Sequence, residues 1–354
     1  MDEILISSCF LKNDHTKEIV PYGSGHINKT YLVNSVRGNT FLLQQINNNI
    51  FTDVDSLMRN IDLVTSYIKY HYPTKTTLEI IKTTENKLYL SVNGDYYRGY
   101  KFINNSTSID IVTDPNDMYI CGKGFGEFLL MLADFDAKSL KETIPNFHNT
   151  ESRFTDFMLS CTKDVKNRVS LCKEEIEFVT SRKKYCSRII SLLNSGEMPY
   201  RVTHNDTKIN NILLDKDTHE ILSVIDLDTV MPGSVCYDFG DSIRAGCNSA
   251  AEDEKDLSKV NFMIEFFKSY ARGYLEQTKN KLTKTEIDNL AFSGILMTYE
   301  CGMRFLTDYL NGDTYFKTTR PNQNLDRARN QFKLVSDMEK LLPEMEEYIA
   351  SICK

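Results

Sequence analysis

The feature that most constrains this chain is a polar loop that leads into an apolar run, THNDTKINNILLD at residues 203–215. Within it, His204, Asp206 and Asn211 have the spacing HxDxxxxN. In phosphoryl-transfer sites, a loop of this spacing supplies a carboxylate that accepts the proton of the acceptor hydroxyl and an amide that holds a magnesium ion. We therefore expect Asp206 to be a catalytic base and Asn211 to be a metal ligand.

A second metal ligand is predicted at the end of a strand. The apolar runs 212–214 and 221–225, separated by the polar turn 215–220, predict a β-hairpin that ends on Asp226. The Asp226 carboxylate would then project beside the catalytic loop, where a second ligand is needed to bridge the metal to the nucleotide phosphates.

These residues also have plainer interpretations. Aspartate and asparagine are common turn formers, so a single Asp-rich loop is more often a solvated turn than a metal site. Here the loop, the hairpin and the downstream Asp226 agree in chain order, which favours phosphoryl transfer. We expect Lys208 to offset charge on the transferred phosphoryl group, the alternative being an exposed turn lysine. We expect His204 to pack the loop and bond to backbone rather than to perform acid-base chemistry.

Composition sets broad limits on the protein. A length of 354 residues favours two domains or lobes, and a net charge of -7 argues against general binding to nucleic acid. The nine cysteines contain no CxxC pair, which indicates neither a zinc site nor a disulfide framework and fits a reducing cytoplasm. The N-terminus lacks a basic region, and no apolar run reaches the roughly 18 residues of a membrane span, so we expect no membrane association. No obligatory protein partner is indicated.

The first hundred residues are rich in β-prone segments. We expect a leading helix or irregular arm over 1–18 and a helix over 52–70 with Thr52 as its N-cap. Strands are predicted over 30–33, 40–46, 78–82, 87–92 and 96–103, with a tight turn at 93–95. This pattern predicts a mainly antiparallel lobe with one helix.

A glycine-containing turn precedes the first of these strands. Gly23, Ser24 and Gly25 would let the backbone approach nucleotide phosphates closely, although a GxG in a hairpin is most often only a turn. In a kinase-type lobe the strand corresponding to 40–46 carries a lysine that pairs with the phosphates, whereas Gln44 and Gln45 stand in that region here. Phosphate binding must therefore depend on backbone amides, metal and other side chains.

The rest of the chain is mainly helical. Apolar spacing predicts helices over 115–135, 151–171, 173–193, 259–275, 284–309 and 326–351. We place the boundary between an N-terminal nucleotide-binding lobe, 1–103, and a C-terminal catalytic lobe, 104–354. The adenine base is expected at the backbone of Lys101, Phe102 and Ile103. The predicted fold class is α+β, a bilobal protein-kinase-like fold with a small β-rich lobe and a larger α-helical lobe.

The order of these features resembles the aminoglycoside phosphotransferase and choline kinase branch of the protein-kinase-like fold. More narrowly, the segments YGSGHINKTYLV (22–33), HNDTKINNILLD (204–215), VIDLDTVMPG (224–233) and RFLTDYLNGDTYFK (304–317) resemble the N-acetylhexosamine 1-kinase group. The resemblance implies transfer of the ATP γ-phosphoryl group to the anomeric hydroxyl of N-acetylglucosamine or N-acetylgalactosamine, with magnesium.

The resemblance also implies site residues. It makes Asp228 a further metal ligand or a positioning group, and it places His26 and Asn28 over the phosphates or beside the sugar. Arg304 would hold the sugar, because a guanidinium can donate two hydrogen bonds to neighbouring oxygens; its plainer interpretation is a surface ion pair. Asp238 and Asp241 are expected to support the catalytic loop.

Two rival functions remain open. The acceptor could be choline, homoserine or an aminoglycoside, and a cationic acceptor would call for carboxylates or an aromatic cage. Alternatively, the chain could be a pseudokinase that binds nucleotide without turnover. The missing strand lysine favours that interpretation, whereas Asp206, Asn211 and Asp226 oppose it.

Overall fold

The computed structural model describes residues 3–23 and 27–354. The chain divides into two compact units, each built from several segments of the sequence. The sheet unit comprises Met1–Ser108, Asp134–Pro145 and Ile212–Pro232, and the helical unit comprises Ile109–Ala133, Asn146–Asn211 and Gly233–Lys354. The predicted hairpin after Asn211 thus belongs to the sheet unit, although it follows more than a hundred residues after the predicted linear boundary at 103.

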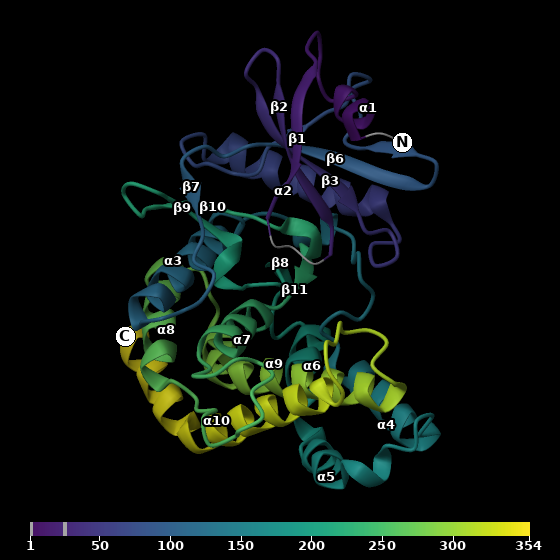
Figure 1. Ribbon diagram of the computed structural model, residues 1–354. Coiled ribbons are helices and arrows are strands. Elements are labelled where there is room, and N and C mark those ends of the chain that lie inside the picture. Colours follow the sequence, from purple (N-terminus) through teal and green to yellow (C-terminus); the bar gives the residue numbers. More distant parts are fainter. Residues whose placement is uncertain (1–2, 24–26) are drawn as a thin grey trace. The chain divides into compact units, whose positions relative to one another are not determined.

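The main sheet of the sheet unit is antiparallel, as predicted. Its order is β1-β2-β3-β6-β4, and β5 also pairs with β6. The strands are β1 (Thr16–Pro21), β2 (Lys29–Ser35), β3 (Thr40–Ile46), β4 (Ile80–Ile81), β5 (Leu90–Val92) and β6 (Asp95–Lys101). A second small sheet has the order β10-β9-β7 (Figure 1), with β7 (Ser106–Thr107), β9 (Ile212–Asp215) and β10 (Ile221–Val224). The latter two strands form the hairpin predicted ahead of Asp226.

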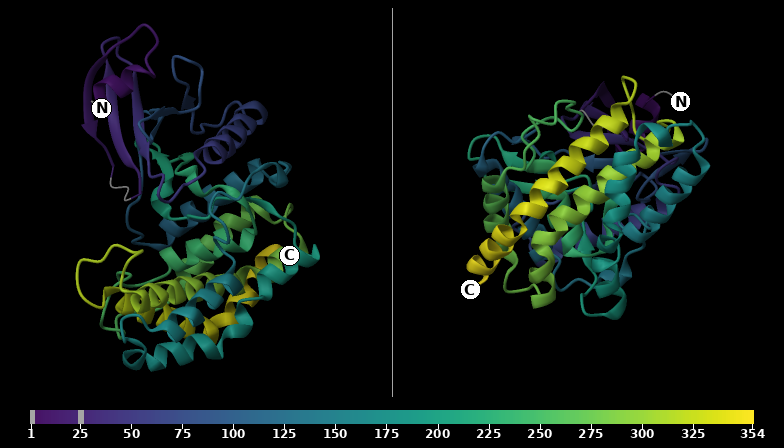
Figure 2. Two further views of the ribbon diagram at one scale, coloured as in Figure 1. Left: turned by 90° about the vertical axis from the view of Figure 1, so that its right-hand side faces the viewer. Right: turned by 90° about the horizontal axis from the view of Figure 1, so that it is seen from below.

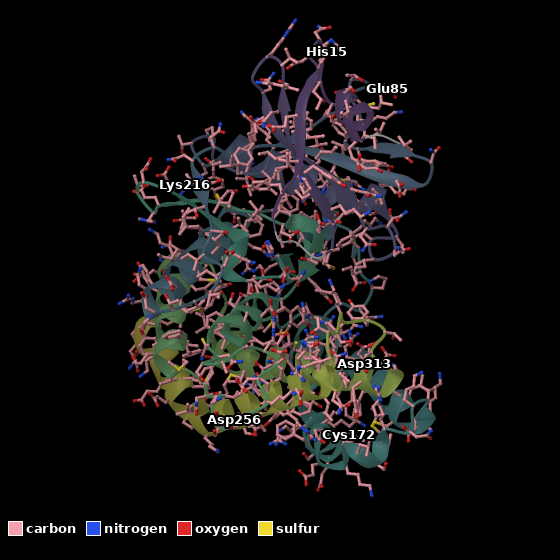
Figure 3. All side chains as sticks on the ribbon, in the orientation of Figure 1. His15, Glu85, Cys172, Lys216, Asp256 and Asp313 are labelled. Atoms are coloured by element: carbon pink, nitrogen blue, oxygen red, sulfur yellow. The ribbon has the colours of Figure 1, made fainter. Side chains whose placement is uncertain are left out.

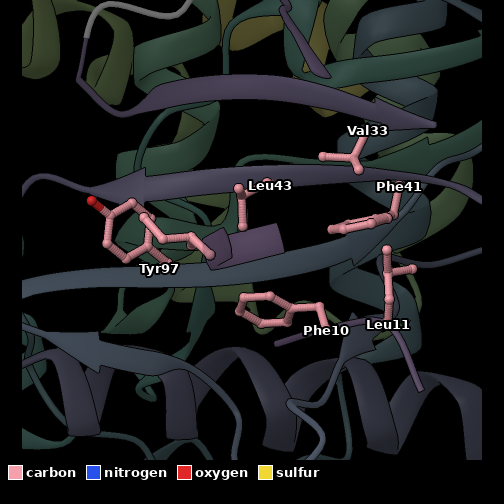
Figure 4. Packing of buried hydrophobic residues seen from close by; sticks show 7 residues of the cluster. Phe10, Leu11, Val33, Phe41, Leu43 and Tyr97 are labelled. Atoms are coloured by element: carbon pink, nitrogen blue, oxygen red, sulfur yellow. The ribbon is translucent and has the colours of Figure 1, made fainter. Parts of the chain in front are cut away.

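One face of the main sheet carries an apolar core. Phe10 and Leu11 follow α1 (Glu3–Ser8) and pack against Phe41 and Leu43 of β3 and Tyr97 of β6 (Figure 4). Residues 1–18 were expected to be a helix or irregular arm, and the helix is present. The strand β1 was missed because its side chains are half-buried or exposed, so the sequence shows no alternating apolar pattern.

The predicted helix after β3 is α2 (Val54–His71). Its apolar face is buried as expected, through Leu57, Ile61, Val64 and Ile68. The N-cap is Asp53 rather than Thr52, because the Asp53 carboxylate accepts a hydrogen bond from the backbone amide of Ser56 at 3.0 Å.

The helical unit is built around two long helices, α9 and α10, that pack along one another (Figure 2). Its helices are α3 (Pro115–Met131), α4 (Thr150–Lys163), α5 (Lys173–Ser181), α6 (Arg188–Ser195), α7 (Val235–Gly246), α8 (Ile264–Thr278), α9 (Lys284–Asn311) and α10 (Gln323–Cys353). Two short strands flank the catalytic segment in the sequence, β8 (Arg201–Thr203) and β11 (Met231–Gly233). No helix in the described part of the chain is long and apolar enough to span a membrane.

Close packing of α7 against α9 fixes the position of α7, the helix that supports the predicted catalytic loop. At Gly240 of α7, an added Cβ would lie 2.3 Å from the backbone oxygen of Ser293 in α9. Only glycine lets the two helix backbones approach this closely. The polar side chains of α7 are thereby held in a fixed place.

Candidate functional site

The predicted catalytic loop, residues 203–211, lies on α7 of the helical unit. The Asp238 carboxylate accepts the backbone amides of His204 at 2.8 Å and Asn205 at 2.7 Å. Asp241 accepts the backbone amide of Thr207 at 3.1 Å. The loop-supporting function predicted for Asp238 and Asp241 is therefore confirmed.

The environment of His204 also matches its predicted structural function. The side chain is fully buried, and its ring makes edge-to-face contacts with Phe125 and Phe128 of α3, at centroid distances of 5.4 and 5.9 Å. The Asp206 backbone amide donates to His204 Nδ1 at 3.3 Å. His204 thus helps to shape the loop that presents Asp206.

The three catalytic-loop residues predicted from the spacing lie together within the helical unit. Lys208 Nζ is 2.8 Å from Asp206 Oδ1. The amide nitrogen of Asn211 donates to the Asp206 carbonyl at 2.8 Å and lies 3.4 Å from Asp206 Oδ2. Desolvation acts to lower the pKa of Lys208, but the Asp206 carboxylate outweighs it and raises the pKa. Lys208 is therefore a cation at neutral pH.

The chemistry of these groups fits a magnesium ion. Because Asn211 donates through its nitrogen, its amide oxygen faces away from the Asp206 carbonyl, and amide and carboxylate oxygens are the ligands that Mg²⁺ prefers. Among the described residues, no group of three or more His, Cys, Asp and Glu side chains forms a ready-made metal cluster. A divalent ion would thus be held by few protein ligands together with nucleotide phosphates, as is usual for Mg²⁺.

In the sheet unit, Asp226 follows β10 and has an unusual backbone conformation. Its φ is 60° and its ψ is 57°, the left-handed region that non-glycine residues rarely adopt. Two residues later, Asp228 is buried and lies 2.6 Å from Nη1 of Arg98 through its Oδ1. Its Oδ2 accepts from Arg98 Nη2 at 2.8 Å and from Asn28 Nδ2 at 2.6 Å.

The predicted nucleotide-binding residues are spread over the sheet unit. Gly23 has a φ of 77°, consistent with a turn that requires glycine. Gln44 donates to Thr30 Oγ1 at 3.0 Å and accepts from Arg98 Nε at 2.9 Å. The predicted residues Ser24, Gly25 and His26 lie outside the described residues.

The segment predicted to contact adenine follows β6. Lys101 is the last residue of that strand and is exposed. The ring of Phe102 meets Tyr22 edge to face at 5.8 Å, and the Ile103 carbonyl accepts from Ser106 Oγ at 2.6 Å. The assignment of these residues to adenine stays a prediction.

Arg304 lies on α9 among aromatic rings. Its guanidinium carbon is 5.6 Å from the ring centroids of Phe147 and Phe316, and 6.0 Å from that of Tyr315. Sequence reasoning identified Arg304 but missed these rings, since Phe147 is distant in the sequence and the loop 312–317 shows no periodic pattern.

A buried carboxylate holds that loop in place. Asp308 accepts the backbone amides of Thr314, Tyr315 and Phe316 at 2.8 to 2.9 Å. It also accepts from Asn324 Nδ2, which in turn donates to Asp313 (labelled in Figure 3) at 3.0 Å. The backbone that carries Tyr315 and Phe316 beside Arg304 is thus held by Asp308.

Comparison with known proteins points to phosphotransferases. Residues 125–279, which include the catalytic loop and α7, match the model of the phosphotransferase enzyme family, APH. A solved aminoglycoside phosphotransferase from Alicyclobacillus acidocaldarius is similar over 98% of this chain and 96% of its own, with a TM-score of 0.63 and 11% identity.

Two further structures have the same fold. An amicoumacin kinase in complex with AMP-PNP and Ca²⁺ is similar over 98% of this chain and 94% of its own, with a TM-score of 0.62 and 13% identity. A choline kinase from Cryptosporidium parvum is similar over 99% of both chains, with a TM-score of 0.59 and 15% identity. The chain thus has the bilobal kinase-like fold of these small-molecule kinases, and its residues 125–279 carry the sequence pattern of the phosphotransferase enzyme family.

Proposed function

We propose that the protein is an ATP- and magnesium-dependent kinase that phosphorylates a hydroxyl group of a small molecule. The observation that carries the proposal is the catalytic loop, in which Asp206, Lys208 and Asn211 are brought together and fixed to α7. The family match covers the same segment. The nucleotide-bound amicoumacin kinase supports ATP as the donor.

Each loop residue has a distinct task in this proposal. Asp206 orients the acceptor hydroxyl and accepts its proton. Lys208, held charged beside Asp206, moves to the transferred phosphoryl group and offsets the negative charge there. Because phosphoryl transfer leaves little bond-making to protein groups, fixed positions and charges account for most of the rate enhancement.

We assign Asn211 and Asp226 as magnesium ligands. When bound, the ion would neutralise phosphate oxygens and orient the γ-phosphoryl group for in-line transfer. Asp228 stays a candidate for a further ligand or a positioning group; its Oδ1 lies 2.6 Å from Arg98 Nη1, and its Oδ2 accepts from Arg98 and Asn28. We assign Gly23 and Gln44 to the phosphate side and Lys101–Ile103 to the adenine side of the nucleotide.

For the acceptor, we propose an N-acetylhexosamine phosphorylated at its anomeric hydroxyl. Arg304 provides a planar pair of donors for neighbouring sugar oxygens, and Tyr315 and Phe316 provide aromatic faces for the apolar side of a sugar ring. Tyr315 is 64% exposed, so its ring is open to a ligand. His26 and Asn28 are assigned to the sugar by resemblance alone.

Choline, homoserine and aminoglycosides remain alternative acceptors, because each carries a hydroxyl group that a kinase of this fold could phosphorylate.

A panel of acceptors tests the proposal. With ATP and magnesium, ADP release should be fastest with N-acetylglucosamine or N-acetylgalactosamine, and slower with choline, homoserine and aminoglycosides. The 1-O-methyl glycoside of the preferred sugar should not react, because its anomeric oxygen carries no transferable proton. Phosphorylation of that glycoside, or a product phosphorylated at carbon 6, would overturn the anomeric assignment and leave a kinase with a different acceptor group.

A further inference from the structure

Arg98 of β6 is the largest fully buried side chain of the described residues, with 1% of its surface exposed. It pairs in register with Gln44, the residue that stands where kinase-type lobes carry a phosphate-binding lysine. The cation Arg98 therefore lies directly beside Gln44, but on the neighbouring strand β6.

This cation is not available to a phosphate group. Both terminal nitrogens of Arg98 are directed at the Asp228 carboxylate, at 2.6 and 2.8 Å, and its Nε donates to Gln44. Burial acts to lower the pKa of Arg98, but the charges of Asp228 and Asp226 outweigh it and raise the pKa. Arg98 is thus a permanent cation whose donors are committed to other protein groups.

The Arg98–Asp228 pair belongs to a network that fixes one short loop. Asn28 donates to Asp228 at 2.6 Å and accepts from the backbone amide of Asn47 at 2.9 Å, so β2 and β3 are tied to the same carboxylate. From α2, Asn60 donates to the carbonyl of Val230 at 3.0 Å. The loop 226–230 is therefore held from two elements, the sheet and the helix.

The residue at the start of this loop is Asp226, in its left-handed conformation. This conformation is uncommon for a residue with a side chain, although aspartate adopts it more readily than most. The groups two and four residues later, Asp228 and the Val230 carbonyl, are the ones that the network holds.

We propose that Arg98, acting through Asp228, is the positioning residue that fixes the Asp226 carboxylate in the orientation needed to bind the metal of the metal–nucleotide complex. This inference rests on the proposed function, since it assumes that Asp226 is a metal ligand. In this proposal Asp228 orients the metal ligand Asp226 and does not itself bind the metal. It also accounts for Gln44, which holds Arg98 in place of a lysine that would contact phosphate.

The test measures how strongly Mg²⁺ promotes ADP binding, by calorimetry with Mg²⁺ and with EDTA. In Asp228→Asn the shape of the side chain is retained, but the charge that holds Arg98 is lost and one acceptor oxygen is replaced by an amide nitrogen that donates. We expect the Mg²⁺-dependent gain in ADP affinity to fall about 10-fold to 100-fold, the range found for residues that orient metal ligands. ADP affinity in EDTA should stay within about threefold of wild type, because the pair touches no nucleotide atom in this proposal.

Two further variants make the result decisive. Arg98→Lys keeps the charge but loses the fork that spans Asp228 and Gln44, so the Mg²⁺-dependent gain should again fall. Lys69→Met, which breaks an exposed ion pair with Glu79 in the same unit, should leave both affinities unchanged.

The outcomes separate this inference from the proposed function. If wild-type protein binds ADP equally well with Mg²⁺ and EDTA, the metal assignment of the proposed function fails. If wild type shows the gain and Asp228→Asn retains it in full, the positioning inference fails alone. Loss of folding in both Asp228→Asn and Arg98→Lys would likewise overturn it, in favour of a purely structural ion pair.

Discussion

At the scale of single residues, most of the candidate site could be predicted from the spacing of residues in the catalytic loop. Asp206, Lys208 and Asn211 were predicted from one short segment, and the structure brings them together because the loop is local in the sequence. Arg98 could not be predicted in the same way. Its partners Gln44 and Asp228 lie 54 and 130 residues away, and nothing in the sequence near Arg98 distinguishes it from a surface arginine on a strand.

The first prediction concerns Asp206. In Asp206→Asn the group that accepts the acceptor proton is lost, so turnover should fall about 10² to 10⁴-fold. ADP affinity should change little, because the substituted group faces the acceptor. Steady-state ADP release and calorimetry measure the two quantities. Asp256→Asn, an isosteric change at an exposed turn, is the control. Near-normal turnover in Asp206→Asn would remove Asp206 from catalysis.

The second prediction concerns Arg304. In Arg304→Lys the charge remains but the rigid two-donor fork is lost. Loss of a charge-assisted hydrogen bond of about 1.5–3 kcal/mol predicts a rise of roughly 10-fold to 100-fold in KM for the acceptor. The KM for ATP should not change. Arg182→Lys, which alters a guanidinium that stacks on Phe178 and pairs with Glu339, is the matched control. An unchanged acceptor KM would exclude Arg304 from the acceptor site.

At the scale of elements, strongly patterned segments were predicted well and weakly patterned ones were not. The strand 40–46 and the hairpin after Asn211 were found as predicted, because each is an apolar run bounded by turn residues. The predicted strand 78–82 shortens to Ile80–Ile81, since only these residues pair with β6. The helix predicted over 173–193 is two helices, α5 and α6, separated by a short 3-10 turn at Lys183–Tyr185.

Packing of α7 on α9 makes a prediction at this scale. In Gly240→Ala the new Cβ meets a backbone oxygen at 2.3 Å, so one helix must shift. In Gly294→Ala the nearest atom is a side-chain carbon of Ile243 at 3.0 Å, which can move by rotation. Overpacking should therefore lower the free energy of unfolding of Gly240→Ala by about 1–3 kcal/mol or more.

Gly294→Ala serves as the control for the difference in helix propensity between glycine and alanine. Alanine is intrinsically favoured over glycine within a helix by about 1 kcal/mol, which offsets part of the cost in both variants. Chemical denaturation should therefore show a clearly larger loss for Gly240→Ala than for Gly294→Ala. Equal stabilities would contradict the close approach of the two helices. Turnover of Gly240→Ala should also fall, since α7 carries Asp238 and Asp241.

At the scale of the whole molecule, the α+β bilobal class was predicted correctly, because β-rich and helical segments are separated along most of the sequence. The order of segments along the chain did not predict which of them belong to each of the two units. Residues 134–145 and 212–232 join the sheet unit through contacts such as the bond from Asn60 Nδ2 to the Lys141 carbonyl, which spans 81 residues. The acceptor was inferred by resemblance alone, since side chains that recognise a neutral sugar have no distinctive spacing.

Ligand-dependent stability gives a prediction for the intact protein. A ligand that binds only the folded state at about 100 times its Kd stabilises it by about 2.7 kcal/mol. ADP with Mg²⁺ should therefore raise the melting temperature clearly more than ADP with EDTA, and Mg²⁺ alone should have little effect. Thermal denaturation under the three conditions measures this. Equal melting temperatures with ADP in Mg²⁺ and in EDTA would contradict metal-assisted nucleotide binding.

The most direct test of the central claim is phosphorus NMR of the protein incubated with ATP, Mg²⁺ and the acceptor panel. We expect ATP to be converted to ADP together with one new sugar phosphate signal whose coupling places the phosphate on the anomeric carbon. Both products should disappear in EDTA and in Asp206→Asn. If wild-type protein binds ADP but forms no phosphorylated product with any acceptor of the panel, the kinase assignment is contradicted and a nucleotide-binding pseudokinase remains.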